Sequence, residues 1–298
     1  MIGWTPPAFE VSDETFLNPR DRDAFLKFKA AILPHNLRIQ SDAVRVQLRA
    51  TLQDVAQAMP GFGAVLSLTR NAATTLSTFN QYPRMSQCRT CTRMFDPAGQ
   101  LTIRANPGIS VKAVQQSVND VTTLGLEMVT ADGICCHRFC LTRGSDWSRF
   151  MEFVTAQQSR FSVFEERAVR RYLGRAACKN NWIRRRAERK RKYGAEPSSV
   201  AERIDFGELS AGVLDKVERG NGLSVTVFNE DVVKSCSFRP NRFESRRYQS
   251  SLTDGMSTWR FDVDQVKELW RVRLPIDEEA VWALEAFDDH DRILFAVI

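Results

Sequence analysis

The stretch ALEAFDDHDRILF, at residues 283–295, repeats the pattern of an earlier stretch, GLEMVTADGICCHRF, at residues 125–139. Each contains a Leu-Glu pair, a turn rich in Asp or Gly, and a returning apolar run. Aligning the Leu-Glu pairs places Glu127 opposite Glu285, a separation of 158 residues. A turn between two alternating apolar runs predicts a hairpin of antiparallel strands in both places.

A second pair of segments has the same separation. AVLSLTRN, at residues 64–71, aligns with GLSVTVFN, at residues 222–229, so that Asn71 and Asn229 are also 158 residues apart. Two independent pairs at one separation indicate a tandem duplication.

The duplication predicts an α+β fold, a tandem pseudo-repeat in which each half is a helical segment followed by an antiparallel β-sheet. Strands are expected where alternating apolar residues lie between turns rich in Gly, Asp, Pro and Asn. They are expected at residues 64–71, 88–96, 101–107, 124–133, 135–142, 223–229, 234–239, 257–263, 268–275, 280–289 and 292–298.

The N-terminal helical segment is expected to span Asp21–Met59. Apolar residues recur there at helical spacing, and the apolar positions within Val44–Leu48 are assigned to its second helix. Ser41 or Asp42 is expected to cap that helix, since short polar side chains accept hydrogen bonds from the first free backbone N–H groups.

Two further helices are expected, at residues 147–154 after a Ser145-Asp146 cap and at residues 207–221. The resulting organisation has three parts. These are a first repeat at residues 21–166, a connector at residues 167–203 and a second repeat at residues 204–298.

The connector contains an unusual concentration of positive charge. Residues 167–193 hold twelve Lys/Arg and one acid, a local charge of +11, whereas the whole chain carries +6. The rest of the chain is therefore mildly acidic, at −5. A basic run of this kind favours an anion contact, a solvated face, or a nucleic-acid surface in which Trp182 and Tyr193 stack on bases.

Cysteine content and the N-terminus indicate the compartment. The seven cysteines are an odd number, and the first residues lack the basic and apolar regions of an export signal. Reduced thiols and a cytoplasmic location are therefore expected. No apolar run approaches the roughly 20 residues that a membrane span needs, so no membrane insertion is expected.

Both halves resemble the HemS/ChuS-type haem-utilisation family. The second half is similar to that family's strand-hairpin signature at Trp270, Arg273, Pro275, Val281, Leu284, Glu285, Phe287 and Asp288. In the first half, VLSLTRN (65–71) and LEMVTADGICCHRFCLT (126–142) resemble two more of its strands. The resemblance covers about residues 25–298 and depends on the order and spacing of the motifs.

The resemblance implies a cytoplasmic protein that receives, carries or degrades imported haem. Its cofactor would be haem, in a cleft between the halves, and its partners would be a haem importer or a haem-accepting enzyme. Some relatives have haem oxygenase-like activity, and no residue here decides whether this chain is an enzyme. LTIRANPG (101–108) matches the strand whose Arg faces the iron, so Arg104 is the candidate for that position.

The chain departs from the family at the expected axial histidine. The only histidines are His35, His137 and His290, and none lies in the connector. The family's histidine would fall near residues 176–178, where this chain has Ala-Ala-Cys.

Cys178 is therefore the candidate metal ligand, because thiolates bind haem iron and nearby cations favour the thiolate. Tyr172 is the second candidate. Alternatively, Cys178 is a small buried residue and the ligand is lost. Arg184, Arg185 and Arg273 are assigned to contacts with the haem carboxylates, which pair well with guanidinium groups.

A zinc site is a weaker hypothesis. Cys88, Cys91, His137 and Cys140 make a possible four-ligand set. Against it, Cys88 and Cys91 are expected on one strand, where residues three apart face opposite sides. His137 is expected to be a structural histidine with its polar atoms satisfied.

Overall fold

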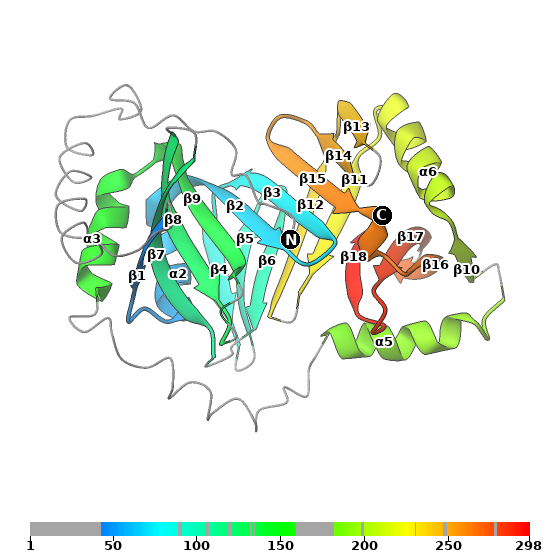
Figure 1. Cartoon of the computed structure of the whole chain (residues 1–298), viewed down its shortest axis with the longest axis horizontal. Coiled ribbons are helices and arrows are strands. Elements are labelled where there is room, and N and C mark those ends of the chain that lie inside the picture. Colours follow the sequence, from blue (N-terminus) through cyan, green and yellow to red (C-terminus); the bar gives the residue numbers. More distant parts are fainter. Residues whose placement is uncertain are drawn as a thin grey trace. The chain divides into compact units, whose positions relative to one another are not determined.

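A computed structural model describes residues 43–88, 91–104, 108–118, 121–131, 133, 135–158, 182–197, 200–229, 231–246, 249–276 and 279–298 (Figure 1). The chain divides into two compact units. The described part of the first unit lies within residues 1–67, 79–94 and 105–176, and that of the second within residues 68–78, 95–104 and 177–298. None of the helices in the described residues has the length and apolar character that crossing a membrane requires.

Within the described residues, eighteen strands form two nine-stranded sheets. The first has the order β1 (Ala43–Gln47), β7 (Ser110–Val118), β8 (Val121–Val129), β9 (Cys135–Ser145), β2 (Gly63–Arg70), β3 (Thr74–Asn80), β15 (Ser257–Asp262), β14 (Gln249–Thr253) and β13 (Arg242–Arg246). The second has the order β10 (Ala201–Ile204), β16 (Glu268–Ile276), β17 (Glu279–Phe287), β18 (Ile293–Val297), β11 (Leu223–Phe228), β12 (Val232–Phe238), β6 (Gly99–Arg104), β5 (Cys91–Asp96) and β4 (Arg84–Gln87). Neighbouring strands pair antiparallel, for example β7 with β8 and β16 with β17. The prediction of an α+β fold built on antiparallel sheets is confirmed.

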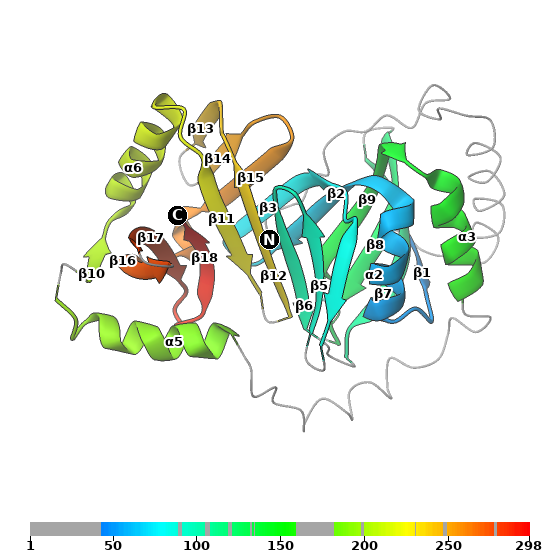
Figure 2. The ribbon, with the colours of Figure 1, turned by 180° about the vertical axis from the view of Figure 1, so that it is seen from behind.

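The two sheets have the same strand order. Adding nine to each strand number of β1-β7-β8-β9-β2-β3 reproduces β10-β16-β17-β18-β11-β12. Each sheet is then completed by three strands from the other half of the sequence. β15 pairs with β3, with Trp259 opposite Leu76, and β6 pairs with β12, with Leu101 opposite Lys234. Figure 2 shows β6 alongside β12.

The segment before the first helix differs from its prediction. Residues 43–47 form strand β1, which pairs with β7, whereas a helix was expected there. Val44, Val46 and Leu48 recur every second residue, which is strand spacing, and Val46 and Leu48 are buried. Helix α2 (Leu52–Ala58) begins later, and the predicted caps Ser41 and Asp42 lie outside the described residues.

The cap of α2 is Thr51. Its hydroxyl accepts a hydrogen bond from the Asp54 N–H at 3.2 Å, and the Asp54 carboxylate accepts one from the Thr51 N–H at 2.7 Å. This reciprocal pair is a capping box, which stabilises the first turn of a helix by satisfying two free donors. The short 3₁₀ helix η3 (Met59–Phe62) follows and leads into β2.

The later helices agree better with the sequence. α3 (Trp147–Gln157) is capped by Asp146, which accepts a hydrogen bond from the Arg149 N–H at 2.9 Å, as predicted. α6 (Phe206–Glu218) is capped in the same way by Asp205. The remaining helical elements are α5 (Trp182–Tyr193), from the basic connector, and η4 (Val263–Gln265).

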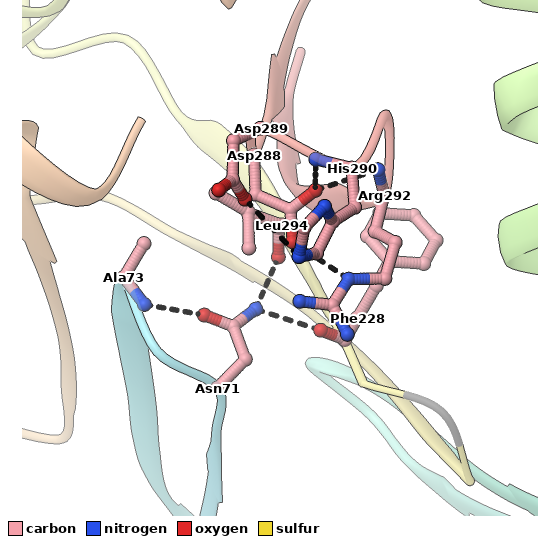
Figure 3. A network of polar contacts seen from close by, with 8 residues as sticks. All are labelled: Asn71, Ala73, Phe228, Asp288, Asp289, His290, Arg292 and Leu294. Atoms are coloured by element: carbon pink, nitrogen blue, oxygen red, sulfur yellow. Dashed lines mark hydrogen bonds and ion pairs between the residues drawn. The ribbon is translucent and has the colours of Figure 1, made fainter. Parts of the chain in front are cut away.

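The aligned asparagines play the same part in both halves. Asn71 Oδ1 accepts hydrogen bonds from the N–H groups two and three residues ahead, at 2.9 and 3.0 Å, and Asn229 Oδ1 does the same at 3.1 and 2.7 Å. Each therefore closes the turn between two strands, a use typical of asparagine. Figure 3 shows the Asn71 amide group, which also donates to the carbonyls of Phe228 and Leu294 at 2.7 Å each.

In the second unit, the two faces of β16 and β17 carry different apolar clusters. One cluster joins Leu269 of β16 to Leu209 and Val213 of α6. The other joins Val272 of β16 and Phe287 of β17 to Tyr193 of α5, and α5 is drawn close to β18 in Figure 1. Side chains alternate between faces along a strand, so α5 and the α6 cluster lie on opposite faces of these strands.

Candidate functional site

Helix α5 is held on its sheet face by one buried carboxylate. Glu285 of β17 is fully buried, and its Oε2 accepts a hydrogen bond from the Tyr193 hydroxyl at 2.5 Å. Its Oε1 accepts a charge-assisted hydrogen bond from Arg186 Nη1. Burial, and then the charge of Glu285, raise the pKa of Tyr193, which keeps its proton to donate.

Lys190 lies one helical turn after Arg186 and makes a second set of contacts with the sheet. Its Nζ lies 2.8 Å from the Glu268 carboxylate, is ion-paired with Asp291, and lies 5.3 Å from the centre of the Phe287 ring. Burial by itself lowers the pKa of Lys190, but hydrogen bonds to Asp291 and Glu268 outweigh it and raise that pKa. The hydrogen bond from Lys190 lowers the pKa of Glu268.

These contacts change how the basic connector is interpreted. Arg186 and Lys190 bind acids of the sheet, and Tyr193, 4% exposed, packs against Trp270 with ring centres 5.5 Å apart. Tyr193 therefore cannot stack on bases. Arg191 and Lys192 are exposed at the end of α5 and are the described cations of this helix that lie on a solvated face.

Arg104, the candidate for the position facing the iron, lies at the end of β6. Its guanidinium is ion-paired with Asp231, and its backbone N–H donates to the Asp231 carbonyl at 2.8 Å. The Asp231 side chain is 4% exposed and that of Arg104 is 18% exposed. A ligand that takes this guanidinium must compete with a nearly buried carboxylate, because a buried ion strongly prefers a partner.

Arg273 lies in a different environment. It is exposed on β16, opposite Trp282 of β17 in the strand register, and Trp282 is itself 42% exposed. The guanidinium carbon of Arg271 lies 5.6 Å from the centre of the Trp282 ring, and Arg271 is ion-paired with Glu202 at 2.5 Å. Alternation along β16 places Arg273 on the face opposite to the one that α5 covers.

The remaining candidates are only partly within the described structure. Arg184 and Arg185 belong to α5, but their side chains are outside the described part, as are Cys178 and Tyr172 entirely. Among the described residues, no contact joins Arg104 to Arg273. The described residues therefore show the surroundings of Arg104 and Arg273 alone among the candidate haem contacts, and the roles of all six stay predictions.

Sequence reasoning did not single out Glu285 or Asp231 as site residues. Glu285 was recognisable as an acid inside the apolar alternation AVWALEAF, a position that normally requires a buried partner. Its aligned residue Glu127 is also buried, and it accepts a hydrogen bond from Arg45 at 2.8 Å and lies 3.7 Å from Arg138.

His137 is a buried structural histidine, as predicted. Its Nε2 lies 3.3 Å from the Ser67 hydroxyl, which is 2.8 Å from the Tyr82 hydroxyl. Within the described residues there is no group of three or more His, Cys, Asp or Glu side chains that could hold a metal ion. The zinc hypothesis therefore has no support in the described structure.

Comparisons with known proteins identify the fold. No family model and no curated protein sequence matches the chain. Among solved structures, it is similar to holo-PhuS, a heme-binding protein from Pseudomonas aeruginosa, with 18% identity and a TM-score of 0.69 over 93% of this chain and 92% of that one. ChuS, an E. coli heme oxygenase, has 14% identity and a TM-score of 0.73 over 94% and 90%.

A second structure of ChuS, the heme degrading enzyme of E. coli O157:H7, has 13% identity and a TM-score of 0.74 over 93% of this chain and 92% of that one. At these identities the likeness concerns the fold. The chain thus has the fold of ChuS and PhuS along nearly its whole length, and the resemblance in fold expected from the motifs is confirmed.

Proposed function

We propose that this chain is a haem-binding protein that receives, carries or degrades haem. The observation that supports this best is the fold, which it shares over 93–94% of its length with proteins described as heme-binding or heme-degrading. Bound haem would supply the iron and porphyrin chemistry. The chain would contribute binding, orientation and exclusion of water.

The residues proposed to hold haem are Arg184, Arg185 and Arg273 for its carboxylates and Cys178 or Tyr172 as the iron ligand, with Arg104 as the residue that faces the iron. The described residues fit part of this assignment. Arg273 is exposed beside the exposed indole of Trp282, and a guanidinium next to an aromatic surface suits a flat apolar ring that carries carboxylates. Thiolate and phenolate are both known haem-iron ligands.

The resemblance and the repeated strand order also support a proposal for where haem binds, in which compartment the protein works and with which partner. We place one site between two repeats at residues 21–166 and 204–298, joined by the connector at residues 167–203. Each repeat would be a helical segment with an antiparallel sheet. The protein would work in the cytoplasm, with a haem importer or a haem-accepting enzyme as its partner.

A hemin titration of the purified chain tests the binding proposal. Saturation at one equivalent, with a Soret band distinct from that of free hemin, is expected. A spectrum that remains that of free hemin at every ratio would refute haem binding.

The iron ligand is tested by two substitutions. If the Cys178 thiolate binds iron, Cys178→Ala is expected to shift the Soret band and Tyr172→Phe to leave it unchanged. If the Tyr172 phenolate binds iron, Tyr172→Phe is expected to shift the band and Cys178→Ala to leave it unchanged. Cys236→Ala is the matched control, because Cys236 is a buried cysteine of an apolar cluster. A band that neither substitution moves would remove both residues from the ligand set.

The alternative is a diverged, non-haem protein that binds nucleic acid or a protein partner through the basic connector. Salt-dependent retention of DNA or RNA, lost on neutralising Arg184, Arg185 and Arg186, would favour it. Arg186 is already bound to Glu285, so neutralising it alone is expected to loosen α5 and to change retention little. Absence of retention at low salt would dismiss the nucleic-acid form of the alternative.

A further inference from the structure

Cys88 and Cys91 lie in contact with each other, which corrects the expectation that they share one strand and face opposite sides. Their sulfur atoms are 3.1 Å apart, and the Cys88 N–H donates to the Cys91 carbonyl at 2.9 Å. β4 ends at Gln87 and β5 begins at Cys91, so the two cysteines lie on either side of residues 89–90 and do not share a strand. Residues three apart along one strand point to opposite faces, whereas these two are joined by a backbone hydrogen bond and their side chains meet.

The aligned hairpin of the second half supports this geometry. Residues 246 and 249, which are 158 positions after Cys88 and Cys91, are directly opposed where β13 pairs with β14. Opposed residues of an antiparallel hydrogen-bonded pair have Cα atoms about 5.5 Å apart. That separation lies within the range of about 4.4–6.8 Å that a disulfide requires.

The two thiols differ in ways that suit successive steps. Cys88 is exposed, whereas Cys91 is 7% exposed. Burial, and then the neighbouring Cys88, raise the pKa of Cys91, which disfavours its direct attack on a solute. Cys88 is the accessible sulfur and Cys91 is the sulfur positioned to react with it.

We propose that Cys88 and Cys91 form a thiol–disulfide exchange site whose substrate is a low-molecular-weight disulfide. The Cys88 thiolate attacks one sulfur of the disulfide RSSR, forming a mixed disulfide and releasing RS⁻. The Cys91 thiolate then attacks the Cys88 sulfur, forming the Cys88–Cys91 disulfide and releasing a second RS⁻. The protein loses two protons and two electrons, and RSSR is reduced to two RSH.

The other adjacent cysteines lack this arrangement. Cys135 and Cys136 are consecutive residues of β9, so they point to opposite faces, and their sulfurs donate to the carbonyls of His137 and Met128. Cys140 is buried, and burial raises the pKa of its thiol to about 11. Cys136 and Cys140 are therefore internal controls that should stay reduced and unmodified.

The test uses the full-length protein without haem, reduced and then equilibrated with glutathione disulfide and glutathione at a series of ratios. Remaining thiols are alkylated in acid-quenched, denatured protein, and peptides spanning residues 85–93 are measured by mass spectrometry. In the wild type, both cysteines are expected to lose alkylation together through an internal disulfide, with no accumulating glutathione adduct.

Single substitutions separate the steps. Cys91→Ser should trap the glutathione adduct on Cys88, with occupancy at least about tenfold above the wild type. Cys91→Ala should do the same, which guards against an effect of a buried hydroxyl. Cys88→Ser should leave Cys91 as a thiol.

A trivalent arsenical, phenylarsine oxide, gives an independent readout, because it bridges two adjacent thiols. One equivalent should bind the reduced wild type, and none should bind Cys88→Ser or Cys91→Ser. The proposal is overturned if the wild type keeps both thiols at every ratio, or if it accumulates the glutathione adduct as strongly as Cys91→Ser. Because haem is absent throughout, neither result bears on the haem proposal.

Discussion

Individual buried charges carry much of the structural specificity of this chain. Glu127 and Glu285 occupy aligned positions on apolar strands, and each is satisfied by Arg side chains. A carboxylate removed from water is tolerated only with partners of this kind. The two acids differ in where the partners come from, since Arg45 and Arg138 belong to strands, whereas Arg186 belongs to the connector helix.

Glu285→Gln tests whether the ion pair between Glu285 and Arg186 stabilises the fold. The substitution keeps the shape of the side chain but leaves the partly buried Arg186 without a counter-charge, so the free energy of unfolding should fall by about 2–3 kcal/mol. Urea unfolding measures it, with the exposed Glu196→Gln as the control. An unchanged midpoint, or a coupling energy near zero in a double-mutant cycle with Arg186→Met, would contradict the assignment.

Lys234 makes stability depend on pH. It is 2% exposed on β12, and burial lowers its pKa to about 7 from the ordinary lysine value of 10.5. The unfolded chain therefore binds one more proton than the folded chain between these values. Linkage requires the free energy of unfolding to rise as the pH rises through that window.

Lys234→Met should remove this rise. For the wild type, the contribution between pH 7 and pH 9 is expected to be about 2–3 kcal/mol. Urea unfolding at pH 7, 8 and 9 measures the slope, and Lys192→Met, an exposed lysine, serves as the control. A slope that survives in Lys234→Met would show that another group causes it. The aligned position in the first half is the buried Leu76, so an apolar side chain fits this strand.

At the scale of elements, α5 depends on its sheet for its structure. Ten of its twelve residues, IRRRAERKRK, lie between an aromatic at each end, and seven of the twelve are Lys or Arg. Like charges at helical spacing repel each other. Contacts of Arg186, Lys190 and Tyr193 with acids and aromatics of the sheet offset that repulsion.

Tyr193→Phe should loosen α5 without disturbing its aromatic packing. The substitution removes the hydrogen bond to Glu285 but keeps the ring against Trp270 and Phe287. Limited trypsin digestion should cut within α5 several-fold faster than in the wild type, because cleavage follows local opening. Tyr82→Phe, which removes a buried hydroxyl contact in the other unit, should leave that rate unchanged.

The sequence predicted the Asp146 cap and eleven of the described strands, but it did not predict β1 or six others, which are β3, β4, β7, β10, β13 and β14. The caps at Asp146 and Asp205 and the turns at Asn71 and Asn229 use side chains that bond to backbone a few residues away. Such signals are local and can be read from sequence. Residues 43–47 had period-two alternation, but it is too short to outweigh the neighbouring helical pattern without knowledge of β7 as a partner.

At the scale of the whole molecule, each half of the sequence completes the sheet of the other. β15 pairs with β3 and β6 pairs with β12, so no half has its full set of strands within its own sequence. Cutting the chain between the halves should therefore leave two incomplete sheets.

A chain divided at residues 197/198 tests this dependence. The fragments 1–197 and 198–298, produced separately, should each lack a cooperative unfolding transition. Mixed during refolding, they should associate and regain one, detected by circular dichroism and by gel filtration. A cooperative transition in either fragment alone would contradict the dependence on exchanged strands.

The sequence by itself determined the strand-rich α+β class, the 158-residue separation between the halves, the Asp146 cap, and the resemblance in fold to the HemS/ChuS type. Alternation, turn residues and motif spacing are properties of neighbouring residues, so they are visible without coordinates. Only the tertiary structure decided that β3 pairs with β15 and β12 with β6, that the sulfurs of Cys88 and Cys91 meet, and that Arg186 and Lys190 bind acids of the sheet. These facts depend on which distant segments become neighbours, and that choice follows from the burial of the whole chain.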